Sequence, residues 1–278
     1  MYDHVHTEKL VDQWLIEDVG NGDLTANLII DAAASTTFDV NAREDMVVAG
    51  IEVMATVFRR YVPGVSIDIR VQDGARVAKG TVLARVSGQA RGLLTAERTA
   101  LNILQRLSGI ATETARFVAA IAGTKAQMID TRKTTPGLRA LEKHAVLCGG
   151  ARNHRLGLDS GVMLKDNHIA VCGGISQAVA RAKAAVPILA KVEVECDRLD
   201  QVREALEAGA DVIMLDNMSL ADMRSAVAFI DGRVPLEASG GVRYETIRGI
   251  AETGVDFISS SKITQSAPAV DIGLDEAV

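Results

Sequence analysis

Several features that define common protein classes are scarce or missing in this chain of 278 residues. Its three cysteines, Cys148, Cys172 and Cys196, are too few and too scattered for a disulfide framework or a zinc ribbon. No apolar stretch reaches the roughly 18 residues that cross a bilayer. The first ten residues lack the basic start and apolar run of a secretory signal. We therefore expect a cytoplasmic protein with no membrane partner.

Basic residues are fewer than acidic residues, so the formal net charge is −6 and the pI is near 5.5. This balance argues against a general nucleic-acid binder. Hydrophobic residues make up 48% and charged residues 24% of the chain, which is typical of a packed globular protein. The length allows one large domain or two ordinary ones.

The familiar catalytic signatures are missing as well. The sequence has no G-x-S-x-G elbow, no Walker loop and no G-x-G-x-x-G after a strand. No cysteine is spaced from a histidine as in a known nucleophilic pair. We therefore expect a site that works by binding and charge stabilisation, without a protein nucleophile.

The first part of the chain mixes helical and strand patterns. Apolar residues with helical spacing predict a short helix around residues 10–16, a second over 50–62, and one long helix or two helices over 93–122, with a break near Ser108-Gly109. Alternating apolar residues predict strands over 65–71 and 82–86, and residues 36–49 read as a strand and turn. These patterns indicate a small α/β domain.

The second part alternates short apolar runs with amphipathic helices. The runs are 126–129, 161–164, 189–194, 212–215, 235–238 and 255–258, and the clearest helices between them are 176–186, 199–208, 219–230 and 244–253. This alternation predicts a parallel sheet covered by helices. Six strands in about 140 residues are too few for a complete barrel. We expect an incomplete or distorted α/β barrel, with an open doubly wound sheet as the alternative.

Polar residues follow most of these predicted strands. They are Asp130, Lys165, Glu195, Asp216, Ser239 and Ser259 to Ser261. In a β/α barrel the carboxyl ends of the strands converge on one mouth, where the chemistry occurs. This placement favours the barrel and predicts that these residues share a site.

A basic segment stands out in the acidic chain. Residues 130–168 contain seven Lys or Arg against four acidic residues. A solvated helix face accounts for Arg139 and Lys143, which are four residues apart. It does not account for Arg132, Lys133, Arg155 and Lys165, because a buried cation needs an anionic partner. We interpret these four as ligands of a small anion, while His154 fits either a ligand or a structural role.

Two further groups suggest phosphate and metal chemistry. Glu193 and Glu195 lie two apart on one strand and share a face, and Asp216 ends the next strand. They suit either Mg²⁺ or a role as counter-ions to the lysines. The turn Ser239-Gly240-Gly241 comes between a strand and a helix, where backbone amides bind anions.

Longer stretches resemble one known family. They include Asp130–Arg139, Glu142–Val146, Asn153–Leu158, Leu164–Ile169, Val192–Glu195, Met214–Met218 and Glu237–Gly241. In order and in spacing they are similar to the quinolinate phosphoribosyltransferases. The likeness extends to Glu17-Asp18, Gly22–Thr25 and Glu97–Asn102, and so covers essentially the whole chain.

The resemblance implies a two-domain organisation and a reaction. Residues 1–107 would form an N-terminal α/β sandwich, residues 108–266 an incomplete α/β barrel, and the tail 267–278 would return to the first domain. Members of the family convert quinolinate and 5-phosphoribosyl 1-diphosphate to nicotinate mononucleotide, CO₂ and pyrophosphate, with Mg²⁺, in NAD synthesis. They form homodimers or larger assemblies with shared active sites.

The resemblance also assigns roles by position. Arg132, His154, Arg155 and Lys165 would hold the quinolinate carboxylates, and Thr131 belongs to the same loop. Lys133 and Lys165 would lie near the reacting ribose and pyridine, and Arg98 would enter the site of the partner subunit. Glu195 and Asp216 would bind ribose hydroxyls and the metal-bound pyrophosphate. Ser239, Gly240, Gly241, Ser260, Ser261 and Lys262 would surround the 5′-phosphate.

The chain departs from the family pattern at a few positions. Ser261-Lys262 and Gln265 occupy a loop where the family commonly has Gly-Ala and His, and Ala151 replaces a usual glycine. Two other functions compete with the assignment. One is a related phosphoribosyltransferase of molybdate operons, and the other is a non-catalytic sensor of phosphoribosyl diphosphate.

Overall fold

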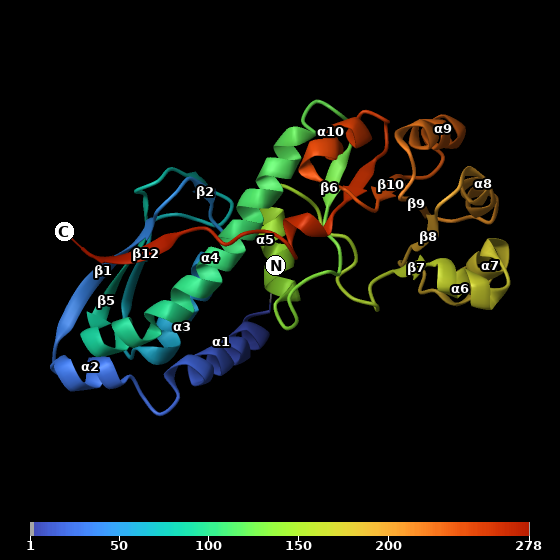
Figure 1. Ribbon diagram of the computed structural model, residues 1–278. Helices are drawn as coiled ribbons and strands as arrows, with labels where there is room; N and C mark the ends of the chain where they lie inside the picture. Colours follow the sequence, from blue (N-terminus) through green and yellow to red (C-terminus); the bar gives the residue numbers. More distant parts are fainter. Residues whose placement is uncertain (1–2, 278) are drawn as a thin grey trace. The chain divides into compact units, whose positions relative to one another are not determined.

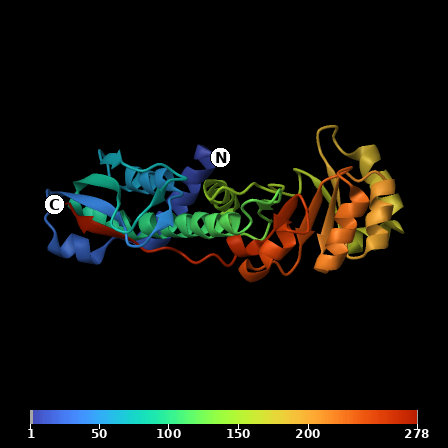
Figure 2. The same ribbon diagram turned by 90° about the horizontal axis from the view of Figure 1, so that it is seen from above.

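The computed structural model describes residues 3–277, which form two compact units (Figures 1 and 2). The first, here called the sandwich unit, contains the chain up to residue 115, residues 135–150 and the tail from residue 267. The second, the barrel unit, contains residues 116–134 and 151–266. The domain boundary expected at residues 107 and 108 stays a prediction.

The sandwich unit combines an antiparallel sheet with helices. Its sheet has the strand order β12-β1-β5-β3, with β1 (Ser35–Ala42), β3 (Ser66–Ile69), β5 (Val82–Gln89) and β12 (Ile272–Glu276). A two-stranded ribbon joins β2 (Met46–Val47) and β4 (Arg76–Val77). The helices of this unit include α1 (His4–Val19), α2 (Leu24–Ile29), α3 (Ile51–Tyr61) and α5 (Arg139–Cys148). The helices predicted near residues 10–16 and 50–62 and the strands predicted near 65–71 and 82–86 are confirmed.

Helix α3 shows why this segment folds as it does. Val53, Met54, Val57 and Phe58 repeat at helical spacing and are fully buried. Burial of a side chain the size of Phe58 contributes about 1.5–3 kcal/mol. Gly50 precedes the helix with φ +91°, a left-handed conformation that glycine adopts without strain.

The segment predicted as one or two helices is a single helix, α4 (Ala90–Ala120). Of the two alternatives, the single long helix is confirmed, and the helix continues through Ser108-Gly109. A Cβ on Gly109 would lie 2.0 Å from the carbonyl oxygen of Pro268, so the glycine allows the tail to pass against the helix. Gln105 and Arg106 then donate to the carbonyls of Ile272 and Ala267, both at 2.8 Å.

The tail continues from this contact into β12, which pairs antiparallel with β1 between Phe38↔Glu276 and Ala42↔Ile272. The sequence of the tail has no strand pattern of its own. Its hydrogen bonds to β1 and α4 therefore decide its structure.

The interpretation of Arg139 and Lys143 as a solvated face is wrong for Lys143, which is only 1% exposed in α5. The same helix buries the carboxylate of Glu142, which accepts hydrogen bonds from Arg106 at 2.9 Å and from the Thr135 hydroxyl at 2.7 Å. Spacing of four residues placed both cations on one helix face but did not show that this face packs inward.

The barrel unit contains six parallel strands in the order β6-β11-β10-β9-β8-β7. They are β6 (Gln127–Ile129), β7 (Val162–Leu164), β8 (Val192–Cys196), β9 (Val212–Asp216), β10 (Leu236–Ser239) and β11 (Phe257–Ser259). The helices that follow are α6 (Asp166–Cys172), α7 (Ile175–Ala185), α8 (Leu199–Glu207), α9 (Leu220–Ile230) and α10 (Tyr244–Ala251).

This strand order shows an incomplete α/β barrel. The strands β7 to β11 are neighbours in chain order, and the first strand, β6, returns beside the last one, β11. A doubly wound sheet would instead reverse its order at a switch point. Helices α7, α8 and α9 cover the outer face of the strands (Figure 1). Among the described residues β6 and β7 do not pair, so the barrel is open between them.

One strand boundary differs from expectation. The run 189–194 was expected to be a strand, but β8 begins at Val192 and Leu189 is 95% exposed in the preceding loop. Apolar character alone did not distinguish loop from strand there. Within residues 3–277, no helix has the length and apolar character needed to cross a membrane.

Candidate active site

Loops at the carboxyl ends of β6, β10 and β11 enclose one cavity of about 270 Å³. Its lining contains eight of the residues predicted from the sequence: Thr131, Lys133, Ser239, Gly240, Gly241, Ser260, Ser261 and Lys262. These residues come from three distant parts of the chain. The barrel brings them together because parallel strands end on the same side of the sheet.

The glycine turn of this cavity has a conformation that other residues avoid. Gly240 and Gly241 have φ values of +83° and +59°. A Cβ on Gly240 would lie 2.3 Å from Oδ1 of Asn217, so that position has no room for a side chain. The Asn217 amide donates to the carbonyl of Ser239 at 3.0 Å, which ties the turn to the end of β9.

The other walls of this cavity are held by local hydrogen bonds. The Ser260 hydroxyl donates to the carbonyl of Val242 and accepts from the amide of Lys262 at 3.2 Å. The amide of Lys133 donates to the hydroxyl of Thr131 at 3.0 Å. Hydroxyls, backbone amides and two exposed lysines make this cavity suitable for an anion.

Arg132 and Arg155 lie near each other in the barrel unit. Burial and the charge of Arg132 together hold the pKa of Arg155 below its ordinary value. Arg155 donates to the carbonyl of Gly161 at 3.0 Å. The Nε of Arg132 is buried and has no hydrogen-bond partner among the described residues. Two neighbouring guanidinium groups with a spare donor are an arrangement that an anion would stabilise.

Lys165, Glu195 and Asp216 stand at the ends of β7, β8 and β9. The ammonium of Lys165 forms an ion pair with Glu195. Asp216 accepts a hydrogen bond from the side chain of Asn217 at 2.8 Å. The interpretation of Glu195 as a counter-ion to a lysine is therefore confirmed in this structure.

Carboxylates on adjacent strand ends have the chemistry that Mg²⁺ prefers, since this ion takes one or two protein carboxylates and completes its shell with other oxygens. Glu195 and Asp216 are half-buried on the neighbouring strands β8 and β9. Two other groups of the described residues bring three metal-binding atoms within 4.8 Å: Asp73, His144 and Cys148, and His154, Glu193 and Glu237. In both groups the histidine Nε2 already bonds to a carboxylate.

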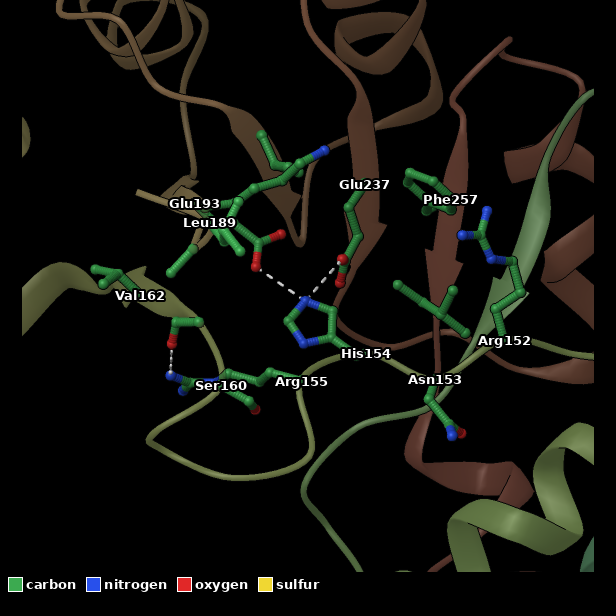
Figure 3. Close-up of a pocket in the computed structure, with 15 residues that line it drawn as sticks. Arg152, Asn153, His154, Arg155, Ser160, Val162, Leu189, Glu193, Glu237 and Phe257 are labelled. Carbon is green, nitrogen blue, oxygen red and sulfur yellow. Dashed lines mark hydrogen bonds and ion pairs between the residues drawn. The ribbon is translucent and has the colours of Figure 1, made fainter. Parts of the chain in front are cut away.

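His154 lies inside the barrel, below the strand ends. Its Nε2 is 2.9 Å from Glu193 Oε2 and 3.3 Å from Glu237 Oε2, as Figure 3 shows. Both glutamates are second residues of their strands, β8 and β10. The ring and both carboxylates line a cavity of about 350 Å³.

This second cavity lies nearer the starts of the strands than the first one. Its lining includes Val162, Val212 and Phe257, which stand at the amino-terminal starts of their strands. His154, Arg155 and Glu193 therefore face the barrel interior and not only the rim. The segment that leads to His154 runs alongside β6, where Arg152 forms a parallel bridge with Ile129.

The sequence reasoning missed Glu237 as a separate functional candidate. It is only 1% exposed and lies beside Glu193 and His154. The signal was an acidic residue within the apolar run 235–238, where burial without a partner would be costly.

Arg98 lies on α4 in the sandwich unit, where its side chain is exposed and 3.7 Å from Glu97. Its predicted entry into a partner subunit's site stays a prediction.

Family models match almost the whole chain. The N-terminal domain model of quinolinate phosphoribosyl transferase matches residues 23–108, and the C-terminal domain model matches residues 110–275. The chain belongs to the quinolinate phosphoribosyltransferase family.

Members of this family are similar to the chain along their full length. A probable nicotinate-nucleotide pyrophosphorylase [carboxylating] of Bacillus subtilis is 40% identical over 272 residues, covering 98% of this chain and 94% of that protein. The Mycobacterium leprae enzyme is 44% identical, covering 94% of each. The nicotinate-nucleotide pyrophosphorylase structure from Francisella tularensis has a TM-score of 0.96 at 40% identity, covering 100% of this chain and 98% of that one.

Proposed function

We propose that this protein transfers the phosphoribosyl group of 5-phosphoribosyl 1-diphosphate to quinolinate, with loss of CO₂, and so forms nicotinate mononucleotide for NAD synthesis. Relatives at about 40% identity over nearly the full chain have the matching name. The reaction is a pentosyl transfer, and its substrates are small and strongly anionic.

The observation that carries this proposal is the pair Arg132 and Arg155. The buried Nε of Arg132 has no hydrogen-bond partner within residues 3–277, and burial and the neighbouring Arg132 lower the pKa of Arg155. A ligand with two carboxylates relieves both costs, because each guanidinium can bind one of them. Quinolinate is such a dianion, and Lys165 supplies a third cation.

The cavity lined by Ser239–Gly241 and Ser260–Lys262 is where we place the 5′-phosphate of the sugar donor. Its amides and hydroxyls can donate to phosphate oxygens, while Lys133 and Lys262 supply positive charge. Ser261 and Lys262 depart from the family pattern but offer a backbone amide and a cation at the same place.

Glu195 and Asp216 are the residues that would hold ribose hydroxyls and Mg²⁺. When bound, the ion would neutralise charge on the pyrophosphate leaving group. The carboxylates of this chain orient the sugar, and Lys165 keeps Glu195 in place through its ion pair.

The chemistry then needs little from the protein beyond orientation and charge. The bond between C1 of ribose and pyrophosphate breaks with its electron pair leaving on the pyrophosphate, and the pyridine nitrogen attacks the resulting oxocarbenium-like centre. The nitrogen becomes positive, so the bond from the ring to the 2-carboxylate can break, leaving its electron pair on the ring carbon. CO₂ departs, and that carbon takes up one proton. Fixed cations near both substrates are worth several kcal/mol each in such a site.

The proposal extends to assembly and place of action. We propose a homodimer or larger homo-oligomer with Arg98 contributed across subunits, working in the cytoplasm. Both parts follow from the resemblance described above and stay predictions.

A product assay tests the proposed function. Purified protein is mixed with quinolinate, 5-phosphoribosyl 1-diphosphate and Mg²⁺, and nicotinate mononucleotide and CO₂ are measured. We expect equal amounts of both products and no reaction with nicotinate. Binding without turnover would support the sensor, and turnover of nicotinate in place of quinolinate would refute the decarboxylating assignment.

A further inference from the structure

The barrel unit buries two carboxylates against a single histidine nitrogen. Glu193 is 5% exposed and Glu237 is 1% exposed, and both place one oxygen on Nε2 of His154 (Figure 3). The strands β8 and β10 that carry them are separated by β9, so their side chains converge from two directions. Such convergence on one nitrogen fixes the plane and the position of the ring.

The main chain at His154 is fixed as well. Its amide donates to Oδ1 of Asp130 at 2.8 Å, and Asp130 is fully buried at the end of β6. Buried carboxylates therefore hold the main chain of His154 at its amide and the ring at Nε2. A side chain with so many constraints has one orientation, which a binding group requires.

The ring of His154 lies in direct contact with both buried carboxylates. Two carboxylates face one imidazole, and the other charged side chains that line the same cavity are Arg152, Arg155 and Lys191. Arg152 is 2.8 Å from the amide oxygen of Gln127, and Arg155 donates to the carbonyl of Gly161. Among the described residues neither arginine forms a hydrogen bond to the two glutamates, although the charge of Glu193 acts on Arg155. The imidazole of His154 contacts both carboxylates directly.

We propose that Glu193 and Glu237 are positioning residues that hold His154 as an imidazolium, ready for a substrate carboxylate. This proposal rests on the proposed function in one respect, which is that the bound anion is quinolinate. The two glutamates act through His154 and not on the substrate. They make the quinolinate site cationic at pH values where a free histidine is neutral.

The pKa values agree with this geometry. Burial alone would lower the pKa of His154, but hydrogen bonds to Glu193 and Glu237 and their charges raise it to about 10. Burial and the charge of Glu193 raise the pKa of Glu237 to about 7, against the opposing effect of His154. At neutral pH the ring is thus charged, and the cluster carries little net charge.

The direct test is the charge of His154 measured by NMR on the full-length protein labelled with ¹⁵N-histidine. The signal of His154 is the one that His154→Gln removes. We expect imidazolium nitrogen shifts up to at least pH 8.5 in the wild type. In Glu193→Gln the midpoint should fall by at least one pH unit, while the exposed control Glu207→Gln should leave it unchanged. A neutral ring at pH 7.5 in the wild type would overturn the proposal without any variant.

The second test measures the steady-state kinetics of the two glutamate variants. In Glu193→Gln and Glu237→Gln, KM for quinolinate should rise about tenfold at pH 8 and much less at pH 6, with kcat changed less than threefold. Equal loss of kcat at both pH values would point to a structural role and contradict the proposal. If the wild type does not turn over quinolinate, the proposed function fails, yet the NMR result still decides the charge of His154.

Discussion

His144 and His154 each pair with carboxylates, one in the sandwich unit and one in the barrel unit. His144 bonds to Asp73 at 2.7 Å, and the second oxygen of Asp73 accepts from the amide of Ile51 at 3.0 Å. His154 bonds to Glu193 and Glu237, and among the described residues the second oxygen of each glutamate is buried without a hydrogen-bond partner. Both oxygens of Asp73 are bonded, whereas only one oxygen of each glutamate is.

The difference agrees with a structural role for the pair of His144 and with the binding role proposed for His154. Asp73 links α5 to the start of α3, and although burial would raise its pKa, the hydrogen bonds from His144, Ile51 and Gly50 bring the pKa below its ordinary value. The barrel cluster keeps unsatisfied buried oxygens and a pKa near 7 at Glu237. Proteins retain such costs mainly where a ligand or a reaction uses them.

The largest effect should follow a change at the barrel rim. Lys165→Ala removes a cation beside both substrates, and we expect kcat/KM to fall about 10²–10³-fold. The matched control is Lys183→Ala, which removes a surface lysine paired with Asp211 and should leave the rate within twofold. Near-normal rates in Lys165→Ala, with circular dichroism unchanged, would mean that the site is elsewhere.

Replacing each histidine separately by glutamine tests whether the two pairs have different roles. His154→Gln loses a charged contact to the substrate, so KM for quinolinate should rise roughly 10–100-fold. His144→Gln should leave KM within twofold but lower the free energy of unfolding by about 1–3 kcal/mol, because Asp73 loses a buried partner. Steady-state kinetics and denaturant unfolding measure both quantities. The opposite pattern would reverse the roles given to the two pairs.

The pH dependence of stability sharpens the contrast. The pKa of Glu237 is about 7 in the folded chain and near 4.5 when unfolded, so between these values the folded state binds more protons. The free energy of unfolding should therefore fall as pH rises from 4.5 to 7. Denaturant titrations should show a weaker fall in Glu237→Gln.

The contribution of Asp73 to stability should change with pH in the opposite direction to that of Glu237. Folding lowers the pKa of Asp73 below its unfolded value of 3.8, so the ionised carboxylate stabilises the fold above that pH. This contribution is lost as the pH falls through the pKa of the folded state. For Glu237, one outcome would contradict the raised pKa. The free energy of unfolding would rise between pH 4.5 and 7 in the wild type but not in Glu237→Gln.

The smallest effect belongs to an exposed residue of the phosphate cavity. Lys262→Ala should raise KM for 5-phosphoribosyl 1-diphosphate about two- to fivefold, because an exposed cation contributes little. Lys125→Ala, at an exposed pair with Asp256 in the same unit, is the control and should change nothing. A loss larger than tenfold would show that Lys262 replaces the usual contacts of the family.

Patterning predicted the barrel well because its strands are continuous apolar runs separated by amphipathic helices. The structure places Lys165, Glu195, Asp216 and Ser239 at the carboxyl ends of strands as expected, since the topology of a parallel sheet fixes where those positions lie. Their roles in a site stay predictions.

Contacts between distant segments could not be predicted in the same way. The glycine at position 109 left open whether the segment was one helix or two, and in the structure it is the place where Pro268 passes against α4. Lys143 looked solvated because helical spacing shows which residues share a face and not which face packs inward. Glu237 was expected in a strand and lies in one, but its contact with His154 could not be predicted, because His154 and Glu193 lie far away in the sequence.

The measurement that tests the central claim most directly uses quinolinate labelled in its 2-carboxylate. The account predicts that every nicotinate mononucleotide formed is accompanied by one labelled CO₂, with no label left in the nucleotide. Label retained in the nucleotide, or nucleotide formed at the same rate from nicotinate, would contradict it.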